Sequence, residues 1–193
     1  MHHIYHTEGL ILGSKNFEEA GKYYYIFTRD LGMLSVSAQG VRKMSSKLRF
    51  VLQDFSYVKI DLVRGKDFWI LTSASKTNKL ENICKNFEAL KIFANIGKLL
   101  QRLLVGEEAN KELFLDLLNG LTILEKTTDK NDLRNVEIIV VLRILSNLGY
   151  VGNDEILDNI IKSPFEDDLI FKVGKSRLKI LSEINKALSE TQL

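Results

Sequence analysis

Hydrophobic and polar residues alternate in short runs over about the first 76 positions of the chain, and glycines separate the runs. Alternation with a period of two is typical of strands with one buried face, and glycine between runs is typical of turns. The pattern predicts strands at residues 5–12, 22–28, 33–40, 55–63 and 68–73. Five short strands favour a small closed barrel, because closure removes the exposed edges of an open sheet.

The spacing of hydrophobic residues changes to three and four from about Asn78 onward, which indicates amphipathic helices. We expect helices over about 83–104, 113–124, 138–148 and 155–162, and a last one that Ser176 N-caps. Gly149 is placed to end the third helix as a C-cap. The expected fold class is therefore α+β, with a barrel domain at residues 1–78 and an all-α domain at residues 79–193.

Charge is separated along the chain, although the net charge is only +2. Residues 1–80 hold 12 Lys and Arg against 7 Asp and Glu, whereas the remaining residues hold 15 against 18. No acidic residue occurs from Leu31 to Gln53, and the second half of this stretch carries Arg42, Lys43, Lys47 and Arg49. Protein surfaces usually intersperse both signs. A solvated loop is the simpler interpretation, but the cluster is also the pattern of a surface that binds nucleic-acid phosphates.

Other side chains of the barrel can add to such a surface. Ser45 and Ser46 offer hydroxyl donors between the cations. Further cations are candidate DNA contacts, depending on the direction of each strand: Lys22, Lys59, Arg64 and Lys66, with Lys15 and Arg29. Five aromatic rings either stack on bases or fill the barrel, and for most of them we expect the core: Tyr23, Tyr24, Tyr25, Phe27 and Tyr57.

The chain lacks a convincing set of nucleophile, base and metal ligands, so we expect no enzyme, no catalytic residue, no metal and no cofactor. The three histidines His2, His3 and His6 have no carboxylate-rich motif beside them, and a single Cys84 excludes a multi-cysteine zinc site. No apolar run of about 18 residues occurs, and polar residues stand where a signal peptide needs an apolar core. A cytoplasmic protein is expected.

Several separated motifs resemble the bacterial recombination mediator family RecO in order and spacing. They are YHTEGLIL at 5–12, EA at 19–20, FTRDLG at 27–32, AQGVRK at 38–43, KLR at 47–49, LQDF at 52–55 and LVRGK at 62–66. In the second half, LRILSNLGY at 142–150 is similar to the helix before the family's zinc module. The chain continues with VGNDE where zinc-bearing members have paired cysteines, and it is short for the family in this region, so we expect no zinc module.

The resemblance implies an oligonucleotide-binding (OB) barrel followed by a helical domain. It also implies a protein that binds single- and double-stranded DNA, anneals complementary strands and helps RecR to load RecA on DNA coated by single-strand-binding protein. Such a protein is associated with the nucleoid, and we expect a monomer. A basic, non-catalytic module that meets an acidic protein surface is the alternative, because charge alone permits it.

The helical domain is expected, from the same resemblance, to hold the acidic and apolar C-terminal tail of the single-strand-binding protein. Arg102 and Arg143 are the candidate partner-binding residues, since each lies on an otherwise apolar helix. The competing interpretation is an arginine whose stem lies over the core.

Overall fold

The computed structural model describes residues 3–152 and 154–191. These residues form two compact units. The described residues up to Glu81, together with Gly97–Phe114, form the first unit, which we call the barrel unit. The second, the helical unit, contains Asn82–Ile96 and the described residues from Leu115 onward.

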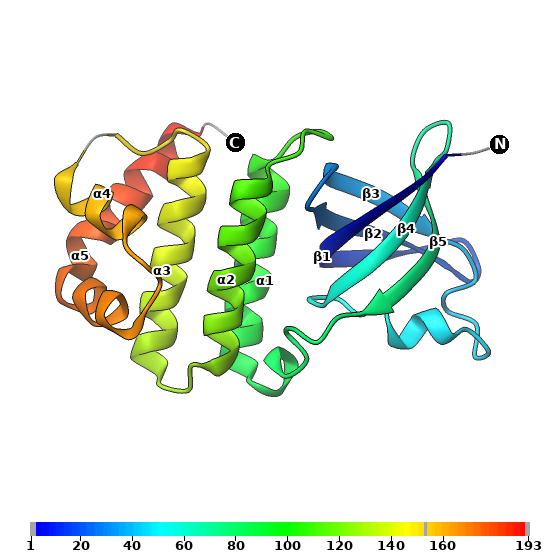
Figure 1. Cartoon of the computed structure of the whole chain (residues 1–193), viewed down its shortest axis with the longest axis horizontal. Coiled ribbons are helices and arrows are strands. Elements are labelled where there is room, and N and C mark those ends of the chain that lie inside the picture. Colours follow the sequence, from blue (N-terminus) through cyan, green and yellow to red (C-terminus); the bar gives the residue numbers. More distant parts are fainter. Residues whose placement is uncertain (1–2, 153, 192–193) are drawn as a thin grey trace. The chain divides into compact units, whose positions relative to one another are not determined.

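The barrel unit contains a closed barrel of five strands (Figure 1). The strands are β1 (Ile4–Phe17), β2 (Gly21–Thr28), β3 (Gly32–Ala38), β4 (Tyr57–Arg64) and β5 (Trp69–Lys76). They follow the order β1-β2-β3-β5-β4, and each neighbouring pair is antiparallel except β3 and β5, which run parallel. This is the order of an OB barrel. The prediction of a five-stranded OB barrel followed by helices is confirmed.

The apolar residues of the alternating strand pattern fill the interior of the barrel. Val58, Ile60 and Leu62 of β4 point inward with 0–1% of their surface exposed, and they share one core with Ile26 of β2 and Val36 of β3. Contiguous burial of branched side chains is the main stabilising contribution to such a small core. The same period of two places the intervening residues on the outer face of the barrel.

Strand ends differ from the predicted ones. β1 continues to Phe17 rather than ending at residue 12, because a bulge between Ile11 and Gly13 shifts its register against β2. β4 begins at Tyr57 rather than at residue 55, since Phe55 adopts a left-handed conformation with φ 65° in the turn before it. β3 ends at Ala38, and Gly40, with φ 65°, lies in the following turn.

Residues 97–114 are fastened to the barrel by close backbone contacts. Gly32 has φ +73°, and a Cβ there would lie 2.4 Å from the carbonyl oxygen of Glu108. The amide of Met33 donates to the carbonyl of Gly106 (3.3 Å), and Lys111 pairs with Asp30 at 3.0 Å. The compact units therefore do not coincide with a single cut after residue 78, and the domain limits 1–78 and 79–193 stay a prediction.

Among the described residues, five α-helices follow the barrel in the chain (Figure 1). They are α1 (Phe87–Leu103), α2 (Lys111–Lys126), α3 (Lys130–Asn147), α4 (Glu155–Lys162) and α5 (Asp167–Glu190). Gly149, with φ 79°, ends α3 as predicted: its amide bonds Ser146 and the next amide, of Tyr150, bonds Leu145. Before α1, Ile83–Lys85 form a short 3-10 turn, η2, in which Cys84 is exposed.

The last helix begins earlier than predicted. α5 starts at Asp167, and Ser176 (φ −109°, ψ 15°) lies at a kink inside it rather than at its N-terminus. The helical turns before the kink carry buried side chains, namely Leu169, Ile170 and Val173. Ser176 therefore does interrupt the helix, but it lies between two helical segments of α5 instead of starting a new helix.

Candidate nucleic-acid interface

The segment from residue 39 to residue 56, which we call the basic loop, joins β3 to β4 and is anchored at two points. Val41 and Leu52 are 1% and 3% exposed and belong to the barrel core. The Tyr24 hydroxyl donates to the carbonyl of Leu52 at 3.3 Å. Leu48 and Val51 pack partly against the same core. The chain between the anchors is therefore held in position, although it lies outside the sheet.

Backbone hydrogen bonds order the part of the basic loop that carries the cations. The amide of Arg42 donates to the carbonyl of Ala20, which lies in the β1–β2 connection (3.0 Å). The amides of Lys43 and Ser46 donate to Gly40 and Lys43 at 3.1 and 3.0 Å. A single 3-10 turn, η1 (Lys47–Phe50), completes the loop. Its cations are thus presented on defined backbone, which lowers the entropic cost of binding.

The four cations of the basic loop have no acidic partner among the residues that the structure describes. Arg42, Lys43 and Lys47 are exposed and Arg49 is half-buried. No carboxylate from residues 3–152 or 154–191 forms an ion pair with any of them. Their positive field is therefore not cancelled locally, as a surface for phosphate groups requires.

A row of aromatic rings lies on the outer face of the barrel. Tyr23 on β2 contacts Phe17 at the end of β1 (centroids 4.3 Å apart) and Phe68 before β5 (5.6 Å). All three rings are half-buried, and Lys15 Nζ lies 5.5 Å from the centroid of the neighbouring Tyr25. Rings that remain partly accessible can stack on bases. The core expectation holds for the three other rings, since Tyr24, Phe27 and Tyr57 are buried.

The other candidate cations of the barrel differ in their exposure and in whether they already have an interaction partner. Lys59 and Lys66 are exposed, whereas Lys22 is half-buried and donates to Ser14 Oγ at 3.1 Å. Arg64 pairs with the Glu107 carboxylate, and its guanidinium carbon lies 5.0 Å from the Trp69 ring centroid. Arg29 lies 3.8 Å from a carboxylate oxygen of Glu8. Direct DNA contact by any of these residues stays a prediction.

Two buried tyrosines of the barrel have perturbed titration. Burial, and to a smaller extent the negative charge of Asp54, raises the pKa of Tyr24 to about 12. Burial also raises the pKa of Tyr57 well above its usual range, and its hydroxyl donates to Glu8 at 2.6 Å. Both hydroxyls therefore stay protonated near neutral pH and act as hydrogen-bond donors.

Arg143, predicted as a partner contact, is buried and paired inside the helical unit. Its side chain is 8% exposed and pairs with Asp116 at 2.7 Å. It also donates to the carbonyl oxygens of Ile160 and Ser163, and its guanidinium faces the Phe165 ring at 5.0 Å. This placement favours a structural role for Arg143. Arg102, the other candidate, is exposed in the last turn of α1.

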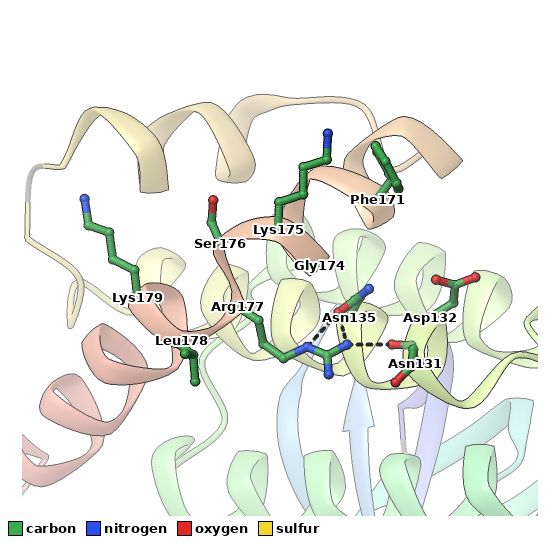
Figure 2. A pocket seen from close by; sticks show the side chains of 10 residues that line it. All are labelled: Asn131, Asp132, Asn135, Phe171, Gly174, Lys175, Ser176, Arg177, Leu178 and Lys179. Carbon is green, nitrogen blue, oxygen red and sulfur yellow. Dashed lines mark hydrogen bonds between the residues drawn. The ribbon is translucent and has the colours of Figure 1, made fainter.

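A groove of about 680 Å³ lies where the kink of α5 faces the first turns of α3 (Figure 2). Its apolar lining includes Phe171 and Leu178, which are 63% and 85% exposed. Lys175, Arg177 and Lys179 supply positive charge, and Asp132 supplies one carboxylate. Phe171 and Leu178 therefore leave apolar surface accessible in a groove that the sequence pattern did not indicate.

Hydrogen bonds fix one wall of the groove. The Arg177 guanidinium donates to Asn135 Oδ1 at 2.7 and 3.1 Å and to the carbonyl of Asn131 at 3.2 Å (Figure 2). Asn135 is 4% exposed, so its amide oxygen has little access to water. Arg177 therefore shapes the groove, while Lys175 and Lys179 point outward (Figure 2).

The part of the chain that the structure describes contains no arrangement of side chains suited to binding a metal. No group of three or more His, Cys, Asp or Glu side chains gathers there. His6 Nδ1 lies 2.6 Å from the Asp61 carboxylate, and His3 stacks edge-on against Tyr5. His2 lies outside the described residues. No helix in residues 3–152 or 154–191 combines the length and apolarity needed to cross a bilayer.

The fold and the basic loop together define an OB-fold protein with a helical extension. Comparison with protein families agrees: residues 1–80 match the family described as "Recombination protein O N terminal". The chain is thus similar to the RecO family over its first 80 residues.

Curated relatives named "DNA repair protein RecO" resemble most of the chain. The protein of Acetivibrio thermocellus is 28% identical over 144 residues, which cover 75% of this chain and 57% of the relative. Those of Clostridium novyi and Heliobacterium modesticaldum are 25% and 29% identical, covering 76% of this chain and 57% and 52% of the relatives. The chain thus spans a little over half of the length of the curated relatives that it matches.

Proposed function

We propose that this chain is a non-catalytic DNA-binding protein of DNA repair and recombination, whose barrel binds DNA through the basic loop. One observation carries the proposal: four cations on a well-anchored loop of an OB barrel have no carboxylate partner among the described residues. Its relatives are named DNA repair protein RecO, which supports the proposal.

Strand annealing is the activity that this surface suits. Two complementary strands repel each other through their phosphates, and cations that neutralise one backbone lower that repulsion. The row formed by Phe17, Tyr23 and Phe68 lets bases rest on rings while Arg42 and its neighbours hold the phosphates. No covalent step is needed, so annealing requires no catalytic residue or cofactor.

A matched pair of quadruple variants tests DNA binding. Arg42, Lys43, Lys47 and Arg49 are changed to Ala in one variant; the control changes four exposed lysines of the helical unit to Ala, namely Lys85, Lys126, Lys130 and Lys186. Both variants lose the same charge. Neutralisation of about four phosphates gives a slope of log K against log[salt] of about −3 to −4.

We expect the loop variant to flatten this slope toward zero and to weaken binding by about 100-fold at low salt, whereas the control keeps the slope. Equal binding by the loop variant and the unmodified chain would sink the proposal. A loop variant that loses an acidic protein partner yet keeps the oligonucleotide would favour the alternative, a protein-interaction module.

We also propose that the groove of Figure 2 receives the tail of a single-strand-binding protein, and that the chain works with RecR when RecA is loaded. An acidic, apolar peptide fits the combination of exposed Phe171 and Leu178 with Lys175 and Lys179. Both partners come from the family resemblance, and the charge of the groove supports the first of them.

A labelled tail peptide distinguishes the two candidate sites. Phe171→Ala combined with Lys175→Ala should weaken peptide binding measured by fluorescence anisotropy, because both the apolar contact and one charge are lost. Arg102→Ala should leave it unchanged. The opposite result would place the peptide near Arg102, away from the groove.

A further inference from the structure

Two large apolar side chains are exposed within the basic loop. Met44 and Phe50 are 84% and 56% exposed, and η1 has no buried residue. Leu48 and Val51, their neighbours in the chain, turn toward the barrel core instead. The loop is therefore anchored without Met44 and Phe50, and their outward positions contribute little to the fold.

Arg49 joins these two side chains into one cluster. Its guanidinium carbon lies 4.4 Å from the centroid of the Phe50 ring, and its Nη1 donates to the Met44 sulfur at 3.1 Å. A guanidinium over a ring and a polarisable thioether form a flat, soft surface. Such a surface suits a planar aromatic ligand better than it suits an isolated phosphate.

The surroundings of the cluster select the ligand. Arg42, Lys43 and Lys47 have no ion-pair partner among residues 3–152 and 154–191, and no acidic residue occurs from Leu31 to Gln53. A ligand that places a flat aromatic group beside several negative charges matches both features. Unpaired bases on a phosphate backbone have this combination, whereas the bases of a duplex are stacked on one another and withheld.

We infer that Met44, Arg49 and Phe50 form a base-stacking contact for single-stranded nucleic acid. This inference rests on the proposed DNA binding and goes further, because it assigns the basic loop a preference for unpaired strands. A base leaves its neighbour, rests on Phe50 and the Arg49 plane, and contacts Met44 at its edge. The adjoining phosphates lie among the three free cations.

The experiment compares three ligands of equal length: an oligothymidine strand, the same strand without bases, and a duplex. Met44→Ala combined with Phe50→Ala should weaken binding of oligothymidine about tenfold and leave the abasic strand within about twofold, with the salt slope unchanged. The single variant Phe50→Trp should bind oligothymidine as tightly as the unmodified chain does, because it keeps an aromatic ring at this position. The fluorescence of the introduced indole should be quenched by oligothymidine but not by the abasic strand.

Phe87→Ala is the matched control, because Phe87 is 75% exposed and belongs to the helical unit. We expect it to change none of the three affinities. Equal losses on the abasic strand and oligothymidine, or no loss on either, would overturn the inference. If the unmodified chain binds none of the three ligands, the proposed DNA binding itself fails.

Discussion

The two units present the same small motif, a phenylalanine under a cation, in opposite electrostatic surroundings. In the basic loop Arg49 lies 4.4 Å from Phe50, and in the groove Lys175 lies 4.4 Å from Phe171. The basic loop has no carboxylate before Asp54, but the groove contains Asp132, and its Lys179 pairs with Asp154 at 3.1 Å. The motif alone therefore does not determine a ligand. The surrounding charge separates a surface for strands from a groove for peptides.

The difference follows from how each backbone arranges charge. A helix brings residues four apart together, so the cations of the helical unit acquire acidic partners such as Asp158 for Lys162 and Asp168 for Lys172. A loop between two buried anchors has no such periodicity. The one acid of the basic loop, Asp54, pairs with none of the loop cations, and they have no ion pair among residues 3–152 and 154–191.

Arg143 gives the largest expected effect, because it is the cation most deeply embedded in the helical unit. Arg143→Met removes the partner of Asp116 and leaves the carbonyl oxygens of Ile160 and Ser163 without a donor. We expect a loss of about 3 kcal/mol in the free energy of unfolding, measured by urea denaturation. DNA affinity of the folded protein should not change.

Arg102→Met is the control for that measurement, since Arg102 is exposed and its replacement should shift stability by less than about 0.5 kcal/mol. A loss below about 1 kcal/mol for Arg143→Met would contradict a structural Arg143. It would return that residue to the set of candidate partner contacts.

Arg177 tests whether the groove wall is a scaffold. Arg177→Lys keeps the charge but loses the two donors that converge on the buried amide oxygen of Asn135. We expect a destabilisation of about 1–2 kcal/mol in urea, because that oxygen loses its partners. The tail peptide should then bind less tightly through loss of shape. Unchanged stability would mean that Arg177 acts only through its charge.

Tyr24→Phe tests the anchor of the basic loop. It removes the hydroxyl that donates to Leu52 at 3.3 Å, and we expect a loss of about 1 kcal/mol in stability. All four loop cations remain. DNA affinity should therefore fall modestly with the salt slope unchanged, and a flattened slope would contradict an anchoring role.

The same variant has a signature at high pH. The folded-state pKa of Tyr24, about 12, lies above the ordinary value of 10.0, so its contribution to stability is complete below pH 10 and is lost as pH rises toward 12. Tyr24→Phe should lose less stability than the unmodified chain across this interval. Parallel curves of urea midpoint against pH would contradict it.

The sequence predicts local features well and contacts between distant segments poorly. Alternation of apolar residues identified the barrel, the acid-free stretch from Leu31 to Gln53 indicated most of the basic loop, and Gly149 ended α3 as expected. The left-handed turn at Phe55 was missed because a bulky residue rarely adopts positive φ. The attachment of residues 97–114 to the barrel depends on the packing of Gly32 against Glu108, and no local sequence pattern predicts this contact.

The groove escaped prediction for a related reason. Phe171 and Leu178 lie on either side of the kink at Ser176, and only the folded helix shows that both line one surface with Asn135 of α3. Arg143 was selected because it interrupts an apolar face. The pattern could not reveal that Asp116, twenty-seven residues earlier in the chain, partners it.

Asp154→Asn is expected to have the smallest effect and makes the groove more like the basic loop. Asp154 caps α4 by accepting from Ile156 and Leu157, and it pairs with Lys179. That ion pair and the capping bonds lower its pKa, so its contribution is present above the ordinary value of 3.8 and is lost as pH falls through the folded-state pKa. Asparagine can keep the cap, but it releases Lys179 into the groove. We expect slightly tighter binding of an acidic peptide near neutral pH, with the difference vanishing in acid; weaker binding would show that Lys179 needs Asp154 to hold it in place.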